Sequence, residues 1–142
     1  MLHVQILLQG DESALARVAD GVFDNAVQPG LAVKYLENPQ NHIAVAIEDG
    51  IVVGFASGIH SVHPDKQAQM WINEVGVAPT HQRRGIGKAV LTELIALARK
   101  LGCSEAWVLT DEDNASARAL YRAAGGTEAR CLMVSFPFSA PG

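Results

Sequence analysis

Alternation of apolar and polar positions predicts several short strands along the chain. The first is an apolar run from Leu2 to Leu8. Residues 42–48 and 51–57 alternate as half-buried strands do, and the Asp49-Gly50 pair between them favours a type I′ turn, so we expect a hairpin here. Three further strands are predicted, over residues 70–77, 105–110 and 127–136.

Helical spacing of apolar residues separates these strands. One helix is expected over residues 11–23, begun by an aspartate that can cap it, and another over residues 29–37, begun by a proline. Residues 86–101 carry apolar side chains every three or four positions, and Gly102 stands where a C′ glycine belongs. A last helix is predicted over residues 114–124, with an asparagine cap. This order predicts a mixed sheet with helices on both faces.

Composition bounds the class of protein. The 142 residues suit a single domain over residues 1–142, and 49% apolar content supports a buried core. Cys103 and Cys131 form no CxxC pair, and we expect both to be buried thiols. The histidines match neither HExxH nor HxxxH spacing, so no metal site is expected.

A net charge of -4 disfavours nucleic acid as a partner. No leader or bilayer-length apolar run is found, so we expect no membrane association and a cytoplasmic location.

A cationic loop, Gln82-Arg83-Arg84-Gly85-Ile86-Gly87-Lys88, joins a predicted strand to the longest predicted helix. Glycine lets the backbone approach a ligand closely, and a helix start presents unpaired N–H groups to an anion. The two arginines add charge for phosphate oxygens. A Walker A loop is excluded by Gln82 and Ala89, and a dinucleotide fingerprint by Val90. A solvated basic loop is the alternative interpretation.

A second candidate cluster lies on the last predicted helix. Asn114 begins this helix, Ala117 follows one turn later, and Tyr121 lies two turns from the start. The alternative interpretation is structural: an N-cap followed by a half-buried core tyrosine.

Together these two segments resemble the GNAT superfamily of N-acetyltransferases. The pattern Gln82-x-x-Gly85-x-Gly87 is similar to that family's acetyl-coenzyme A signature, and Asn114…Ala117…Leu120-Tyr121…Gly125 is similar to its second motif. The resemblance runs from Ile43 to Phe136, and the order of elements also matches. Gly126 departs from it, since relatives often carry an apolar residue there. The resemblance implies a mixed, mostly antiparallel sheet of six to seven strands with helices on both faces.

The resemblance also implies a site for acetyl-CoA as cosubstrate, with no metal. Backbone N–H groups of Arg83–Lys88 would hold the pyrophosphate, with Gln82 beside them, and the strand Val75-Gly76-Val77 would pair with the pantetheine arm, near a bulge. Asn114, Ala117 and Tyr121 would complete this site. Glu74 is the candidate base for the acceptor amine, and Tyr121 the candidate proton donor to the leaving thiolate. For Glu74 the alternatives are an exposed strand carboxylate or an ion pair with a loop arginine.

For the acceptor, the chain resembles small type I aminoglycoside 3-N-acetyltransferases. The likeness rests on a proline-containing loop at residues 63–67, the strand segment Glu74–Val77, and the loop at residues 81–86. It implies that the acceptor is a small-molecule amine, namely an aminoglycoside antibiotic acetylated at the 3-N position. It also implies a role in antibiotic resistance. Another small amine, a protein lysine or N-terminus, and a non-enzymatic acetyl-CoA sensor are the alternatives. Asp111–Asp113 is either a contact for a polycation or a solvated turn. A homodimer is expected, with the strand Cys131–Phe136 contributing.

Overall fold

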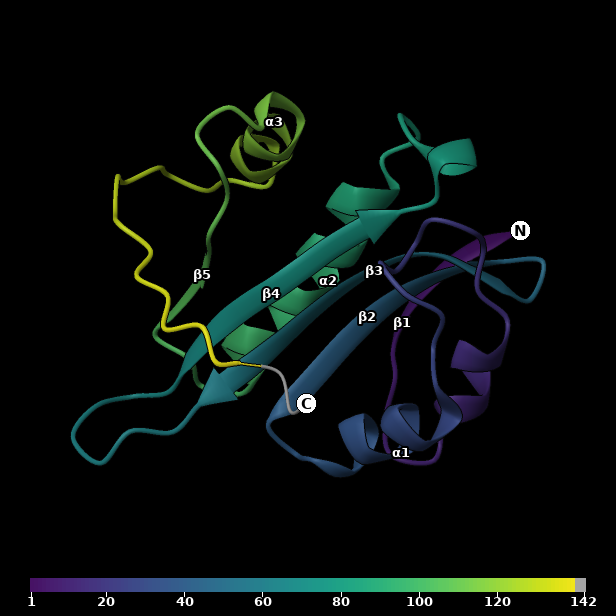
Figure 1. The fold of residues 1–142 in the computed structure, drawn as a ribbon, viewed down its shortest axis with the longest axis horizontal. Helices are drawn as coiled ribbons and strands as arrows, with labels where there is room; N and C mark the ends of the chain where they lie inside the picture. Colours follow the sequence, from purple (N-terminus) through teal and green to yellow (C-terminus); the bar gives the residue numbers. More distant parts are fainter. Residues whose placement is uncertain (140–142) are drawn as a thin grey trace.

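Five strands form a single sheet in the order β1-β2-β3-β4-β5 (Figure 1). The computed structural model describes residues 1–139. The strands are β1 (Leu2–Ile6), β2 (Asn41–Glu48), β3 (Ile51–Ser61), β4 (Gln69–Val77) and β5 (Glu105–Val108). The helices are the 3-10 turns η1 (Glu12–Ala16) and η2 (Pro79–His81) and the α-helices α1 (Pro29–Glu37), α2 (Ile86–Lys100) and α3 (Ala115–Ala123).

The sheet is mixed and mostly antiparallel, as predicted. Strands β1 to β4 pair antiparallel with their neighbours, and β5 runs parallel to β4. The β2–β3 hairpin is confirmed: Asp49 and Gly50 have φ of 54° and 77°, and two positive values are the signature of a type I′ turn. The expected count of six to seven strands is wrong for the described residues, which form five.

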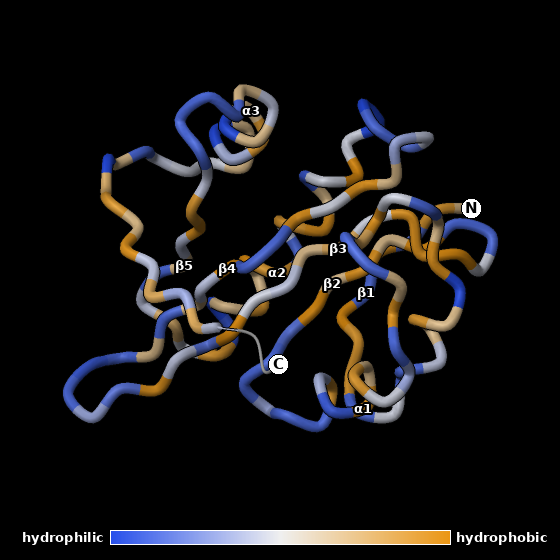
Figure 2. Tube along the Cα trace, in the orientation of Figure 1, coloured by the Kyte–Doolittle hydropathy of each residue, from blue (hydrophilic) through white to orange (hydrophobic). Residues whose placement is uncertain are grey.

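Two apolar clusters cover the two faces of the sheet. One lies between the sheet and α2 and includes Val90 and Leu94 of this helix, both fully buried. The other lies against α1 and η1 and includes Val45 and Phe55 from the opposite sides of the same strands. Alternate residues of β2 and β3 therefore supply different clusters, which is why these central strands are buried on both faces. Figure 2 shows this apolar centre in the tube of β2 and β3.

The helix expected over residues 11–23 is mostly absent. Only η1 forms, and the Asp11 carboxylate accepts a hydrogen bond from the Leu8 N–H at 2.8 Å instead of capping a longer helix. The chain then extends beside β3, where the Ala19 N–H donates to the Val52 carbonyl at 2.9 Å. Gly21, with φ of 81°, turns the chain in a conformation that ends any helix. Tertiary backbone pairing has replaced the local helical pattern.

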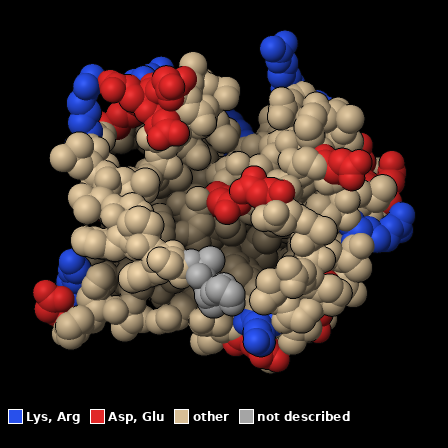
Figure 3. Space-filling view, viewed as in Figure 1, with Lys and Arg blue, Asp and Glu red and all other residues tan. Residues whose placement is uncertain are grey.

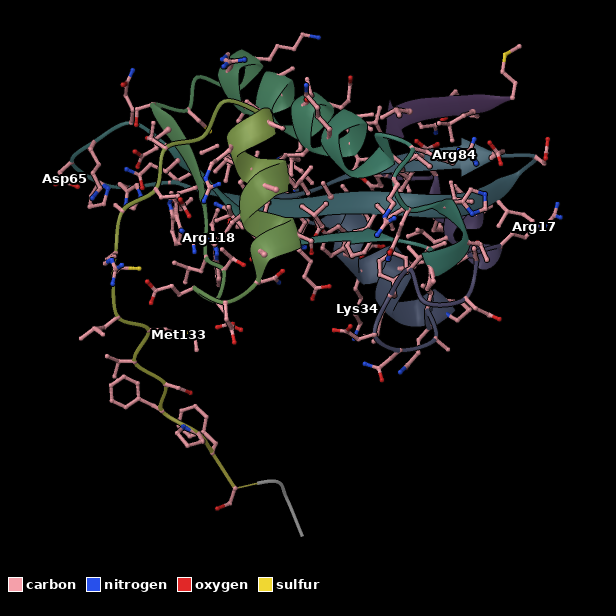
Figure 4. All side chains as sticks on the ribbon, turned by 90° about the horizontal axis from the view of Figure 1, so that it is seen from above. Arg17, Lys34, Asp65, Arg84, Arg118 and Met133 are labelled. Atoms are coloured by element: carbon pink, nitrogen blue, oxygen red, sulfur yellow. The ribbon has the colours of Figure 1, made fainter. Side chains whose placement is uncertain are left out.

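The strand expected over residues 127–136 is also absent. Instead residues 127–139, here called the C-terminal arm, extend from the body without regular structure, as Figure 4 shows around Met133. Glu128 binds Arg118 at 2.6 Å and Arg122 at 3.1 Å, so the start of the arm is tied to α3. Large apolar side chains of the arm are exposed: Leu132, Met133, Val134, Phe136 and Phe138.

Both cysteines are free thiols, but only one is partly enclosed. Cys103 is half-buried after α2, whereas Cys131 lies on the arm and is exposed, so the expectation of two buried thiols is wrong for Cys131. Within residues 1–139 no helix has the length and apolar content to cross a bilayer.

Candidate functional site

Strands β4 and β5 diverge in the middle of the sheet, and this divergence positions the candidate site. Their parallel pairing runs only from Gln69–Glu105 to Ile72–Val108. Beyond Ile72, β4 continues to Val77 paired with β3 alone. Residues 73–77 therefore have one backbone edge that β5 does not use, and an extended ligand can bind to such an edge as an added strand.

A β-bulge occurs where the two strands part. Ser57 of β3 faces Glu74, whereas Gly58 faces Ile72, so Asn73 is the extra residue of β4. Bulges locally bend a strand and re-aim its side chains. The bulge lies next to the candidate base, in the region where the family resemblance placed one.

Glu74 is exposed on the sheet face that carries α1. Tyr35 of α1 lies close to it: burial, together with the negative charge of Glu74, raises the pKa of Tyr35 to about 12. The Tyr35 hydroxyl donates to the His42 carbonyl at 2.6 Å, which fixes α1 to β2 beside Glu74. Figure 3 shows this face hollowed, with acidic side chains at the edge of the hollow. An acceptor can therefore reach the carboxylate from solvent.

The loop before α2 has the conformation of an anion-binding helix start. Arg83 and Gly85 have φ of 63° and 77°, so the chain turns sharply before the helix. The Gly85 carbonyl accepts the first helical hydrogen bond, from Ala89, and no side chain caps this end of α2. The N–H groups of Ile86, Gly87 and Lys88 precede the first helical donor and are free for a ligand. Lys88 is exposed beside them.

One carboxylate at the end of β2 holds this loop. Glu48 Oε2 accepts a hydrogen bond from Arg84 at 2.7 Å, and Glu48 Oε1 contacts Arg84 at 3.3 Å and the His81 ring at 3.1 Å. The Arg84 and His81 hydrogen bonds lower the pKa of Glu48 to about 2. The Arg84 guanidinium (labelled in Figure 4) thus forms an ion pair with Glu48, and its contact with a phosphate stays a prediction. Arg83 belongs to no ion pair among the described residues.

The two sequence motifs meet at the start of α2. A Cβ placed on Gly87 would lie 3.4 Å from a Leu120 methyl and 3.5 Å from a Val77 methyl. The end of β4, the first turn of α2 and the second turn of α3 are therefore in contact. A small residue at position 87 allows this close approach.

Tyr121 lies on the other side of the sheet from Glu74. It lines a cavity of about 290 Å³ between α2, α3 and β5, together with Ile72 and Val108, the last paired residues before the strands part. Burial raises the pKa of the Tyr121 phenol, which is therefore protonated at neutral pH. The two candidate proton-transfer groups therefore lie on opposite faces of the sheet, near the point where β4 and β5 part.

Other residues of the predicted site make contacts that shape the helix or strand to which they belong. Asn114 caps α3, because its Oδ1 accepts a hydrogen bond from the Ala117 N–H at 3.1 Å. Gly76 has no room for a side chain, since a Cβ there would lie 2.5 Å from the Val22 carbonyl oxygen. The neighbouring Val75 and Val77 pack toward the α2 side.

Sequence reasoning missed Glu48 and Tyr35. Glu48 is 36 positions from Arg84, and no local pattern joins them. Tyr35 lies in the region where the sequence resembles no known motif. Over residues 1–139 no group of three or more metal-binding side chains occurs.

Comparison with known proteins agrees with this geometry. The model of the Acetyltransferase (GNAT) family matches residues 14–125. N-alpha-acetyltransferase RimI of Mycobacterium tuberculosis (strain ATCC 25618 / H37Rv) is 34% identical over 121 residues, covering 84% of this chain and 74% of that protein. Mycothiol acetyltransferase of Pseudarthrobacter chlorophenolicus is 32% identical over 127 residues, covering 82% of this chain but only 39% of that longer protein.

Solved structures share the fold. An aminoglycoside acetyltransferase, meta-AAC0020, from an uncultured soil metagenomic sample, in complex with sisomicin, superposes with a TM-score of 0.84 at 18% identity over 97% of both chains. The ribosomal-protein-alanine N-acetyltransferase of Brucella melitensis biovar Abortus 2308 gives a TM-score of 0.70 at 19% identity, over 96% of this chain and all of that one. The family match agrees with the two structural features of the site, the divergent strands and the helix-start loop. The chain belongs to the GNAT acetyltransferase family.

Proposed function

We propose that this N-acetyltransferase moves an acetyl group from acetyl-CoA to a primary amine of a small polyamino acceptor of the aminoglycoside class. The acetyl-transfer chemistry is supported by one observation, the close approach of Gly87 to Val77 and Leu120. This approach brings both sequence motifs to the place where β4 and β5 diverge. The aminoglycoside class is supported by the motif pattern of residues 63–86, which resembles type I 3-N-acetyltransferases.

The residues present fit acetyl-CoA. The free N–H groups at the start of α2 suit its pyrophosphate, with Arg83 and Lys88 as cationic neighbours. Gln82, Asn114 and Ala117 lie on the segments that would border the bound molecule. The unpaired edge of Val75–Val77 suits an extended pantetheine chain. When bound there, acetyl-CoA supplies the acetyl thioester.

In the proposed mechanism, Glu74 removes a proton from the acceptor ammonium, either directly or through a water. An amine with a pKa near 10 is protonated at neutral pH and must lose this proton before it can attack. A backbone N–H at the bulge would donate to the developing oxyanion, which is worth about 3 kcal/mol. Tyr121 would donate its phenolic proton to the leaving thiolate from the opposite side of the sheet.

A protein N-terminus is the second candidate acceptor. It is favoured by the 34% identity with N-alpha-acetyltransferase RimI over most of the chain. The two classes differ in charge: an aminoglycoside or polyamine carries several ammonium groups, whereas a peptide can offer a single α-amino group.

The acceptor is tested by following thiol release from acetyl-CoA with gentamicin, kanamycin, spermidine, a lysine peptide and an alanine-terminated peptide. We expect release with the aminoglycosides, and mass mapping of the product would identify the acetylated nitrogen. Release with only the alanine-terminated peptide would replace the proposed acceptor by a protein N-terminus. Tight acetyl-CoA binding without release for any amine would favour a non-enzymatic sensor.

Glu48→Gln is expected to raise the KM for acetyl-CoA about two- to fivefold while changing kcat little. The substitution weakens the contacts to Arg84 and His81 and loosens the loop, and the expected effect is small because solvent screens an exposed ion pair. Because its pKa is lowered to about 2, Glu48 is ionised throughout the neutral range, and its contacts are lost only as pH falls below about 4.5 toward 2.

Asp49→Asn is the matched control for this prediction. Asp49 is the next residue, has an exposed ion pair with the N-terminal amine at 3.5 Å, and makes no contact with Arg84 or His81. Steady-state kinetics would give an unchanged KM for this variant. Equal KM values for both variants would mean that Glu48 does not position the loop.

The expected homodimer is proposed to use the apolar arm. Leu132 is 92% exposed, and a cluster of large apolar side chains in water favours association. Phe136→Glu is expected to shift sedimentation of the protein toward the monomer, whereas Asp65→Asn, an exposed change in the β3–β4 loop, would not. A wild-type protein that sediments as a monomer at all concentrations would exclude the dimer.

A further inference from the structure

A pair of stacked tryptophans lies exposed on the sheet beside the candidate base. Trp71 of β4 and Trp107 of β5 face each other in the parallel register, with ring centroids 5.6 Å apart and ring planes 12° apart. They keep 42% and 37% of their surface exposed. Indole rings are usually among the best-buried side chains on average, so two exposed rings side by side are a candidate binding surface.

The pairing of β3 with β4 places this surface on the same face as Glu74. Met70 and Ile72 are buried toward α2, so Trp71 between them points to the opposite face, which carries α1. Trp71 faces Ile59 and Glu74 faces Ser57, two residues along β3. Two strand residues span about 7 Å. The tryptophan pair therefore lies roughly 7 Å along the sheet from the Glu74 backbone, directly before the strands diverge.

The two neighbouring groups favour cationic ligands in different ways. The face of an indole ring attracts an ammonium group, and tryptophan is the best aromatic residue for this contact. A carboxylate such as Glu74 attracts an ammonium and can also take its proton. An acceptor with two amines can place one at each group: the amine at Glu74 becomes neutral and reacts, while the other stays charged over the rings. A monoamine can use only one of the two.

We propose that Trp71 and Trp107 form an acceptor-binding platform for a second ammonium group, so that the enzyme selects amines bearing at least two cationic groups. This inference rests on the proposed amine acetylation and names the chemical feature by which the acceptor is chosen. Aminoglycosides and polyamines carry this feature, and simple monoamines do not.

Tryptophan fluorescence reports on this site alone, because the chain contains two tryptophans and both belong to the platform. Titration with kanamycin or spermidine is expected to change the emission saturably without acetyl-CoA, whereas n-butylamine at the same concentration and ionic strength should change it much less. Trp71→Phe and Trp107→Phe each leave one emitter, whose response should weaken but persist. An emission insensitive to both polyamines, or equally sensitive to n-butylamine, would overturn the proposal.

Kinetics separates a binding platform from a merely structural pair. Trp107→Leu is expected to raise the KM for the polyamino acceptor on the order of tenfold and to reduce its advantage over a monoamine, with the KM for acetyl-CoA unchanged. Leu101→Ala, at a residue 40% exposed after α2, is the matched control and should change neither KM. If Trp107→Leu instead lowers the melting temperature and raises the KM of both substrates equally, the tryptophans serve strand packing. That result would overturn the proposal.

The platform and the proposed function fail in different ways. Absence of thiol release in the wild-type protein with every amine would refute the proposed amine acetylation, whatever the fluorescence shows. If Trp107→Leu and Trp71→Phe release thiol with the KM and the diamine preference of the wild-type protein, the platform is refuted. The proposed amine acetylation would stand.

Discussion

Replacing Glu74 by glutamine is expected to lower kcat by a factor on the order of 10² to 10⁴, the usual contribution of a positioned general base. Glutamine keeps the size of the side chain and its place at the bulge but cannot accept the acceptor's proton. The KM for acetyl-CoA should stay unchanged, because the helix-start loop is untouched. Steady-state rates of thiol release at saturating substrates measure the effect.

The pH dependence identifies the missing step. Without a base, only acceptor molecules that are already neutral can react, so the activity of Glu74→Gln should rise with pH toward the amine's pKa of about 10. The deficit relative to wild type should therefore shrink as pH rises. Glu93→Gln, an exposed glutamate on α2, is the matched control and should keep full activity. A kcat for Glu74→Gln close to that of wild type at neutral pH would remove Glu74 from the chemistry.

Gly87→Leu is expected to produce the second large effect, a rise in the KM for acetyl-CoA of tenfold or more. A leucine side chain would occupy the narrow space shared with Leu120 and Val77, and relieving such overpacking costs about 1 to 3 kcal/mol. The simplest relief moves α3 away from α2, which separates the two motifs of the proposed cofactor site. Isothermal titration with coenzyme A would measure this loss.

Gly87→Ala provides the graded control. The alanine Cβ would lie 3.4 Å or more from the Leu120 and Val77 side chains, at the boundary of ordinary contact, so this variant should bind coenzyme A nearly as well as wild type. Circular dichroism would verify that both variants fold. Equal affinity for all three proteins would show that the contact of α2 with α3 does not shape the site.

Local sequence patterns predicted the elements whose stability is set by their own residues. The spacing of apolar residues in α2 and the glycine after it predicted this helix to within a residue, because one apolar stripe and a C′ glycine define both its buried face and its end. Asn114 likewise predicted the start of α3, since a cap is a contact within one turn.

Patterns that depend on distant partners gave wrong predictions. The apolar stripe after Asp11 fits a helix, but backbone pairing of Ala19 with Val52 extends this segment instead. The alternation in residues 127–136 fits a strand, yet a strand forms only where a partner edge is in reach, and Glu128 ties the chain to α3.

By itself the sequence determined the family and located the helix-start loop, and it predicted Glu74 and Tyr121 as candidates, because these are properties of short segments with fixed spacing. Only the tertiary structure decided that Glu48 holds Arg84, that β4 parts from β5 after Ile72, and that two tryptophans stack on the sheet face of Glu74. The physical reason is that ion pairs, strand registers and ring stacking join residues tens of positions apart. Their contact depends on how the whole chain packs, and no local period of the sequence encodes it.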